Sequence, residues 1–170
     1  QIGLQSSNPD VLKAVNRPSD LKTFSRRIAM LNDSGVVFGL DLMYGLPGDT
    51  LSSFRTSLDY AISLYPNNLE IFRLSVLPGT ALYDDASALG LVFQKDPPYS
   101  VESTSKCAPQ DLAKAASLAR ACDVFYSQGR AVTWFLSLLR VLKLKPSQFF
   151  QDFSAYLASS GDDGSREYSH

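Results

Sequence analysis

The sequence predicts an α/β fold built on three parallel strands. Three short apolar segments alternate with stretches whose apolar residues recur at helical spacing, and the links between them are short. Parallel strands need crossover connections of this kind, so the order strand, helix, strand, helix, strand indicates parallel βαβ units. The pattern fits an open sheet or part of a barrel. Beyond about residue 105 the sequence predicts a mainly helical region.

The first elements follow from turn and cap signals. Residues 1–5 are predicted as the last part of a strand, followed by a turn. Asn8 is a suitable cap for a short helix over 10–14, because a proline follows it at the first helical position. A second helix is predicted over about 20–34, since its apolar residues lie on one face and a glycine follows it.

The second and third strands are the most apolar segments. Residues 36–44 read as a buried strand that runs into a glycine-rich turn. A helix is predicted from Thr50 or Ser52 to Pro66, and residues 69–77 are predicted as the third strand. The carboxyl ends of parallel strands are where α/β sheets and barrels place their sites. Polar residues at those ends are therefore the candidates for function.

The remaining residues change in character. They are predicted as a short helix, an extended link, three further helices and a disordered tail, in that order: 83–90, 96–99, 109–128, 131–144, 146–159 and 161–170.

Composition excludes several classes of function. The 170 residues carry a net charge of −1, which gives no bulk electrostatic reason to expect nucleic acid or an anionic membrane as a partner. No apolar run is long enough to span a bilayer. Cys107 and Cys122 lie far apart and offer no metal half-site, so we expect no metal ligands in the chain and a reducing cytoplasm. The single histidine, His170, is in the tail, which argues against histidine-dependent catalysis.

Asp41 is the most informative residue, because an ionised carboxylate inside an apolar strand needs a partner. Alternation along the strand places Gly39, Asp41 and Met43 on one face. That face combines a gap, a carboxylate and a soft apolar group, which suits a bound nucleoside. Gln5 is in the same situation, with Gly3 on its face. The alternative is that a polar side chain of a neighbouring strand satisfies Asp41.

Two further features have competing interpretations. The turn 45–50 could bind phosphate, although it lacks the lysine of a P-loop. A structural turn between strand and helix, with Asp49 or Thr50 as N-cap, is the better explanation. Arg17 lies in a short link, where its guanidinium could pair with a carboxylate of a ligand or form a surface ion pair.

Taken together and in order, these pieces resemble a known family. The series is Gly3-Leu4-Gln5-Ser6, Asn8-Pro9, Val15-Asn16-Arg17, Asp41-Leu42-Met43-Tyr44-Gly45-Leu46-Pro47-Gly48 and Leu77-Pro78-Gly79-Thr80. It is similar to the second half of a radical S-adenosylmethionine (SAM) core, in the branch shared by oxygen-independent coproporphyrinogen oxidases and cobalamin-binding radical SAM proteins. The resemblance implies a partial (β/α) barrel over 1–105 that supplies its last three strands. It also implies a helical C-terminal domain over 106–160, before the tail at 161–170.

The resemblance also implies roles for individual residues. Gln5, with its neighbour Ser6, would bind the methionine or ribose part of SAM, and Arg17 would pair with the methionine carboxylate. Asp41 would accept hydrogen bonds from the ribose hydroxyls. Met43 and Ser75 would line the adenine. None of these residues is expected to be catalytic.

The sequence departs from the family in two respects that bear on its activity. It lacks the three-cysteine loop that holds the 4Fe-4S cluster and the Gly-Gly-Glu segment that holds the SAM amino group. We therefore expect a C-terminal fragment of a radical SAM oxidoreductase. It would help position SAM for reductive cleavage to a 5′-deoxyadenosyl radical and be inactive alone.

Partners follow from the same expectation. The first is the remainder of the fragment's own polypeptide, which would hold the cluster ligands, and the resemblance leaves a cobalamin domain there as an open alternative. An uncovered half-barrel face would also lead the fragment to self-associate or to cover the opening with its helices. The competing hypothesis is a non-catalytic α/β module that binds a partner.

Overall fold

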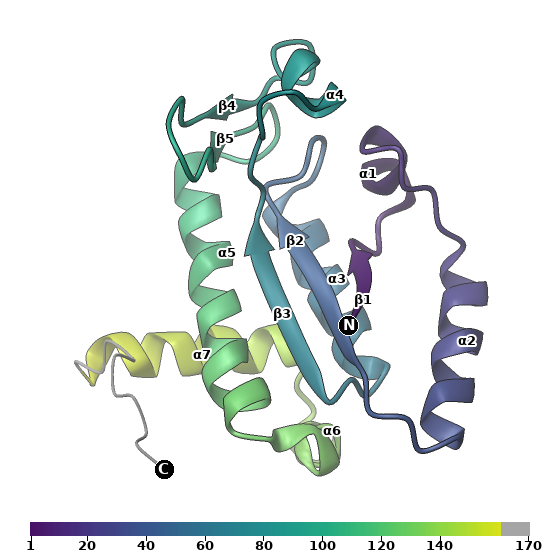
Figure 1. The fold of residues 1–170 in the computed structure, drawn as a ribbon. Helices are drawn as coiled ribbons and strands as arrows, with labels where there is room; N and C mark the ends of the chain where they lie inside the picture. The colour runs from purple at the N-terminus through teal and green to yellow at the C-terminus, as the bar shows by residue number, and fades with distance from the viewer. Residues whose placement is uncertain (161–170) are drawn as a thin grey trace.

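A computed structural model describes residues 1–160 and shows an α/β fold built on a three-stranded parallel sheet (Figure 1). The strands are β1 (Ile2–Gln5), β2 (Gly39–Tyr44) and β3 (Asn68–Arg73), and their order in the sheet is β1-β2-β3. Both strand pairs are parallel. The predicted α/β class, with three parallel strands and a helical C-terminal region, is confirmed.

Helices α1 (Pro9–Ala14), α2 (Leu21–Asp33) and α3 (Leu51–Ser63) connect the strands. Their N-termini begin where the sequence supplies a cap. The Asn8 side chain accepts from the Asp10 amide at 3.0 Å, and the Thr50 hydroxyl accepts from the Ser53 amide at 3.1 Å. Side chains of α3 pack on the sheet face that carries Leu40 and Leu42, and this layer forms the core.

Strand β2 begins three residues later than predicted, at Gly39 rather than Val36. Val36 and Val37 are 48% and 78% exposed. Apolar β-branched residues favoured a strand here, but strands also need neighbours. β1 begins pairing opposite Leu40, and β3 begins opposite Gly39, so the residues before Gly39 have no strand beside them.

The third strand and the segment after it also differ from prediction. β3 ends at Arg73, and residues 74–76 instead pair with the loop at 99–101. The predicted helix over 83–90 is wrong for most of its length, because α4 (Ala81–Asp84) overlaps it only at 83–84 and turns follow. A two-stranded antiparallel sheet was not predicted, because both of its strands are very short: β4 (Val92–Phe93) and β5 (Val101–Ser103).

The helical region is more broken than its sequence pattern predicts. Its elements are α5 (Pro109–Cys122), the π-helical segment η1 (Asp123–Gln128), the 3-10 turn η2 (Ala131–Thr133), α6 (Phe135–Leu142) and α7 (Pro146–Ser159). The prediction of one helix over 109–128 and another over 131–144 is therefore wrong in detail, whereas 146–159 is confirmed.

The π-helical segment brings two side chains against the sheet. The Tyr126 hydroxyl donates to the Pro66 carbonyl at 2.7 Å, and the Ser127 hydroxyl bonds both the amide and the carbonyl of Leu69. Ser127 therefore satisfies backbone groups at the edge of β3 that a further strand would otherwise use. The i→i+5 hydrogen bonding of η1 changes the helical phase after α5 and so alters which side chains face the sheet.

Two sets of contacts attach the C-terminal helices to the rest. Phe135 is fully buried and lies 5.0–5.9 Å, ring centroid to ring centroid, from four other aromatic rings. Asp59 on α3 accepts from the amide and the hydroxyl of Ser147 at 2.7 and 3.0 Å. The region 106–160 thus packs directly on α3 and β3. The predicted tail, 161–170, lies outside the described residues.

Candidate functional site

The candidate site is the sheet face that points away from α3. Gly3 on β1, Asp41 on β2 and Glu70 on β3 are register partners and lie side by side on this face. Within residues 1–160, no helix crosses in front of β2 and β3 on this side (Figure 1). We call this surface the open face. It carries two carboxylates and a glycine that leaves space above β1.

Gln5 and Arg17 meet above Gly3. A Cβ at Gly3 would lie 2.8 Å from Gln5 Nε2 and 3.4 Å from Arg17 Nη1, so both side-chain ends reach over this glycine. Gln5 has a φ of 65°, and the pairing with β2 shifts register between Gly3 and Gln5. The Gln5 side chain that reaches over Gly3 therefore starts from an irregular end of β1. Arg17 is exposed and lies within the link between α1 and α2.

Asp41 has a partner on the open face. Gln1 Nε2 donates to Asp41 Oδ1 at 2.7 Å, and the same amide lies above Gly39, where a side chain would collide with it. An amide N–H therefore reaches Asp41 from the open side of the sheet. A hydroxyl of a ligand could donate to the same oxygen after Gln1 moves aside.

The other predicted residues occupy different surroundings. Met43 is half-buried opposite Phe72, further along the open face. Ser75 lies two residues beyond β3 and pairs with Ser100 in an isolated bridge. Ser6 is fully buried, its hydroxyl 3.3 Å from that of Ser57 and 3.1 Å from the Asn8 amide that it accepts from. That hydroxyl is engaged within the fold.

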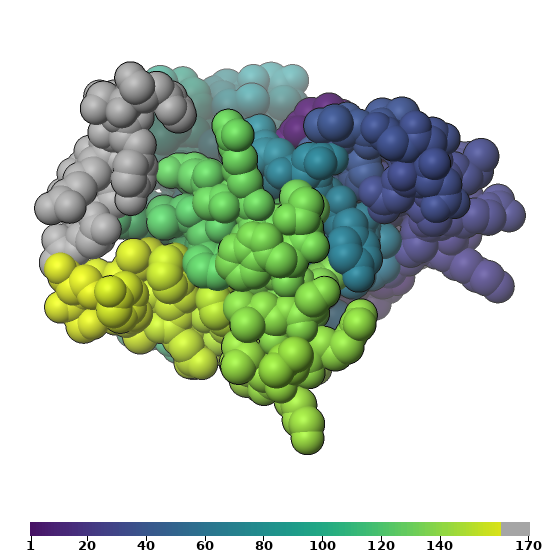
Figure 2. All heavy atoms as spheres, turned by 90° about the horizontal axis from the view of Figure 1, so that it is seen from below, coloured from purple at the N-terminus to yellow at the C-terminus, as the bar shows by residue number. Residues whose placement is uncertain are grey.

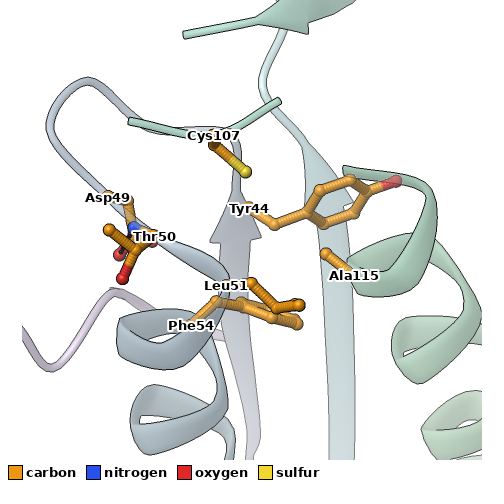
Figure 3. Close-up of a pocket in the computed structure, with 8 residues that line it drawn as sticks. Tyr44, Asp49, Thr50, Leu51, Phe54, Cys107 and Ala115 are labelled. Carbon is orange, nitrogen blue, oxygen red and sulfur yellow. Dashed lines mark hydrogen bonds between the residues drawn. The ribbon is translucent and has the colours of Figure 1, made fainter. Parts of the chain in front are cut away.

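The glycine-rich turn after β2 is packed from below. Figure 3 shows Tyr44, Phe54 and Leu51 filling the space beneath Cys107 and beside Ala115. The hollow that remains between these side chains is too small for a water molecule. This packing agrees with the structural role predicted for the turn.

The buried carboxylate of Asp49 gives an electrostatic reason against phosphate binding at this turn. Its side chain is 2% exposed, and its Oδ1 accepts from the Thr50 amide at 2.9 Å. Burial raises the pKa of Asp49, and its hydrogen bonds to Ser53 and Thr50 oppose that rise. A carboxylate at the N-terminus of α3 uses the position that a phosphate would need, which argues against phosphate binding there.

A separate groove of about 400 Å³ runs between β3 and α5. Glu70, Phe72, Arg120 and Asp123 are among its lining residues. None of the six predicted binding residues lines this groove. Glu70 and Phe72 border both this groove and the open face.

The two cysteines are structural. Both are free and buried, and burial raises the pKa of each thiol, which disfavours the thiolate that binds metal. Across residues 1–160, no group of three or more His, Cys, Asp or Glu side chains is placed to hold a metal ion. In the same part of the chain, no helix combines the length and the apolar character needed to cross a membrane.

Sequence reasoning did not identify Gln1 or Glu70. The signal for Glu70 was available, because Glu70 stands between the apolar Leu69 and Ile71 in a strand that runs parallel to β2. Gln1 carried no signal, since its contact with Asp41 depends on how far β1 reaches along β2.

Comparisons with known proteins find relatives for about half of the chain. The heme chaperone HemW of Buchnera aphidicola is 33% identical over 87 residues, which cover 48% of this chain and 22% of the relative. The oxygen-independent coproporphyrinogen III oxidase of Pseudomonas aeruginosa is 36% identical over 80 residues, covering 45% and 17%. This chain resembles the radical SAM coproporphyrinogen oxidases. The predicted resemblance to the oxygen-independent coproporphyrinogen oxidases is therefore confirmed.

One further relative and one solved structure also match this chain. The threonylcarbamoyladenosine tRNA methylthiotransferase MtaB of Thermotoga maritima is 32% identical over 81 residues, or 46% of this chain and 19% of the relative. The structure of coproporphyrinogen III oxidase (HemN) from Escherichia coli, a radical SAM enzyme, aligns with a TM-score of 0.43 at 22% identity, covering 70% of this chain and 31% of HemN. No protein-family model matches. The chain thus spans about a fifth of the length of its curated relatives.

Proposed function

We propose that this chain supplies SAM-positioning side chains to a radical SAM oxidoreductase and acts together with a longer part of the same polypeptide. The observation that carries the proposal is the meeting of Gln5 and Arg17 above Gly3, beside Asp41 in register. The relatives' much greater length supports a shared site, because the chain corresponds to about a fifth of them.

The side chains at this place fit the two polar ends of SAM. A guanidinium pairs with a carboxylate in bidentate fashion, and Arg17 is exposed enough to reach one. A carboxylate accepts from neighbouring hydroxyls, and Asp41 already accepts from an amide on the open side. The Gln5 amide can both donate and accept between them. The missing Cβ of Gly3 leaves the space in which these groups converge.

Each side chain has a distinct task in this proposal. Arg17 would hold the methionine carboxylate, Gln5 would orient the link between methionine and ribose, and Asp41 would hold the ribose. Met43 would provide an apolar contact for the adenine, and Ser75 a polar boundary beyond β3. For Ser6 the backbone would be the contacting group, because its hydroxyl is already bonded. When bound, SAM supplies the oxidising radical chemistry of the family once it receives an electron from a 4Fe-4S cluster.

The residues described do not fit that cluster. Both cysteines are buried, and Cys122 is fully enclosed on α5. We propose that the cluster ligands lie elsewhere in the polypeptide, so that this chain orients SAM but does not reduce it. A cobalamin domain in the same polypeptide stays a prediction without support from the relatives described above.

Titration calorimetry of SAM with the longest natural polypeptide that contains this chain tests the proposal. Arg17→Ala and Asp41→Ala each remove hydrogen bonds to a charged group, which contribute about 1.5–3 kcal/mol. We therefore expect SAM to bind about 10- to 150-fold more weakly in either variant.

The matched controls are Arg27→Ala and Asp33→Ala, which remove an exposed guanidinium and an exposed carboxylate from α2. They should bind SAM as the unaltered protein does. Equal affinities in all four variants would refute the assigned roles. A polypeptide that binds no SAM at all would favour the non-catalytic interaction module instead.

A further inference from the structure

The segment around α6 combines exposed apolar side chains with several basic residues and no acidic ones. Trp134, Val141 and Leu142 are 45%, 80% and 48% exposed. Within α6, residues 138, 141 and 142 share one side of the helix, next to the side that carries the buried Phe135 and Leu139. Trp134 directly precedes the helix, and its ring lies 5.6 Å, centroid to centroid, from that of Phe125. The apolar residues of this segment therefore extend from the buried side of α6 onto its solvent-exposed surface.

The charges on this segment are of one sign. Between Asp123 and Asp152 the chain contains no acidic residue and four basic ones, Arg130, Arg140, Lys143 and Lys145. Arg140 and Lys143 are exposed and adjoin the apolar face. Lys145 lies near Asp59, whose carboxylate is engaged by Ser147, so we leave it out of the surface. We call Trp134, Leu138, Arg140, Val141, Leu142 and Lys143 the α6 surface.

The α6 surface lies at the opposite end of the sheet from the carboxyl ends of the strands. Figure 1 places α6 below the sheet, where the strands begin, whereas α1 and α4 lie at the carboxyl ends. In Figure 2, which looks at that lower end, the green segment that includes α6 stands nearest the viewer and projects outward. A partner that docks on α6 would leave the carboxyl ends of the strands uncovered.

We propose that the α6 surface docks on an anionic lipid bilayer. Helices that lie in a membrane interface combine an apolar face, often with tryptophan, and flanking lysine or arginine. Tryptophan prefers the headgroup level, and each basic residue near an anionic surface strengthens binding about fivefold. A net charge of −1 for the whole chain does not oppose this, because only charges within about a Debye length of the surface act on it. The proposal is independent of SAM binding.

Vesicle binding of the full 170-residue chain tests it, with pure phosphatidylcholine vesicles compared with equal parts phosphatidylcholine and phosphatidylglycerol. Trp134 is the only tryptophan, so its fluorescence reports on this surface alone. We expect co-sedimentation and a blue shift of Trp134 emission with the anionic vesicles only, both weakened by added salt. Arg140→Gln with Lys143→Gln should weaken binding about 25-fold.

Two further double variants make the test specific. Val141→Ser with Leu142→Ser should also weaken vesicle binding, and both positions are exposed enough that the fold is retained. Arg26→Gln with Arg27→Gln removes two exposed charges from α2 and should bind normally. Absence of binding, equal binding to both vesicle types, or equal loss in the α2 control would overturn the proposal. A different result would also overturn it: the chain binds no vesicles but forms a dimer, and the serine variant abolishes that dimer. The α6 surface would then bind a second copy of the chain.

Discussion

Replacing Gly3 with alanine should weaken SAM binding while leaving the fold at least as stable. The new Cβ would lie 2.8 Å from Gln5 Nε2, whereas carbon contacts are ordinarily about 3.5 Å or more, so the amide must retreat by about 0.7 Å. Arg17 Nη1, at 3.4 Å, would be confined as well. Loss of one aligned hydrogen bond to a charged group, about 1.5 kcal/mol, corresponds to about tenfold weaker binding.

The same substitution, Gly3→Ala, should raise the stability of the fold. Gly3 lies in a strand and does not have a positive φ, so alanine fits its backbone. Such a replacement restricts the unfolded chain and stabilises by about 0.4–1 kcal/mol, which raises Tm by about 1–4 °C for a chain of this size. Opposite changes in affinity and Tm would separate a binding role from general damage to the fold.

The assay is SAM titration calorimetry on the longest natural polypeptide, with thermal melts of the same samples. Gly39→Ala is the matched comparison on the same face, because its Cβ would displace the Gln1 amide, which must in any case leave Asp41 before a ligand hydroxyl binds there, and the atoms nearest to that Cβ include none of Gln5 or Arg17. We expect that control to bind SAM within about twofold of the unaltered protein. Unchanged affinity in Gly3→Ala, with an unaltered Tm, would refute the reasoning that the two side chains form a ligand site.

Three further predictions concern stability. Tyr126→Phe should lower Tm by about 2–12 °C in a thermal melt, because it leaves the buried Pro66 carbonyl without its donor at a cost of about 1–3 kcal/mol. Phe135→Ala should cost about 3–5 kcal/mol in urea unfolding, since it empties the centre of the aromatic cluster, and a separate early transition would show that the helices unfold independently. Burial raises the pKa of Asp49 above 3.8, so the stability it contributes is present below that pH and is lost as pH rises through the folded-state pKa. Compared with Asp49→Asn, the unaltered chain should therefore lose stability in urea titrations between pH 3.8 and neutrality, and a constant difference would contradict this.

The parts of the fold that could be predicted depend on local signals. Asn8 and Thr50 cap helices as expected, because capping involves only residues two or three positions away. The start of β2 could not be predicted, since Val36 and Val37 have strand-forming side chains but no neighbouring strand. The π-helical segment was also unpredictable, because it depends on contacts of Tyr126 and Ser127 with residues about sixty positions away.

The candidate site shows the same division. Alternation alone placed Gly39, Asp41 and Met43 on one face, and the structure shows that arrangement. Gln5 and Arg17 come together only through the irregular end of β1 and the path of the chain after α1. No spacing in the sequence reports such a meeting, so it came from the family resemblance and not from the residues themselves.

The hydrogen bonds between Ser127 and Leu69 make the two edges of the sheet unequal as places for a further strand. The Ser127 hydroxyl occupies both the amide and the carbonyl of Leu69 at the outer edge of β3, so a strand added there would have to displace it. Within residues 1–160, no strand pairs with the outer edge of β1. A further strand that pairs with this sheet should therefore assemble on β1, next to Gln5, on the side where the candidate ligand groups already lie.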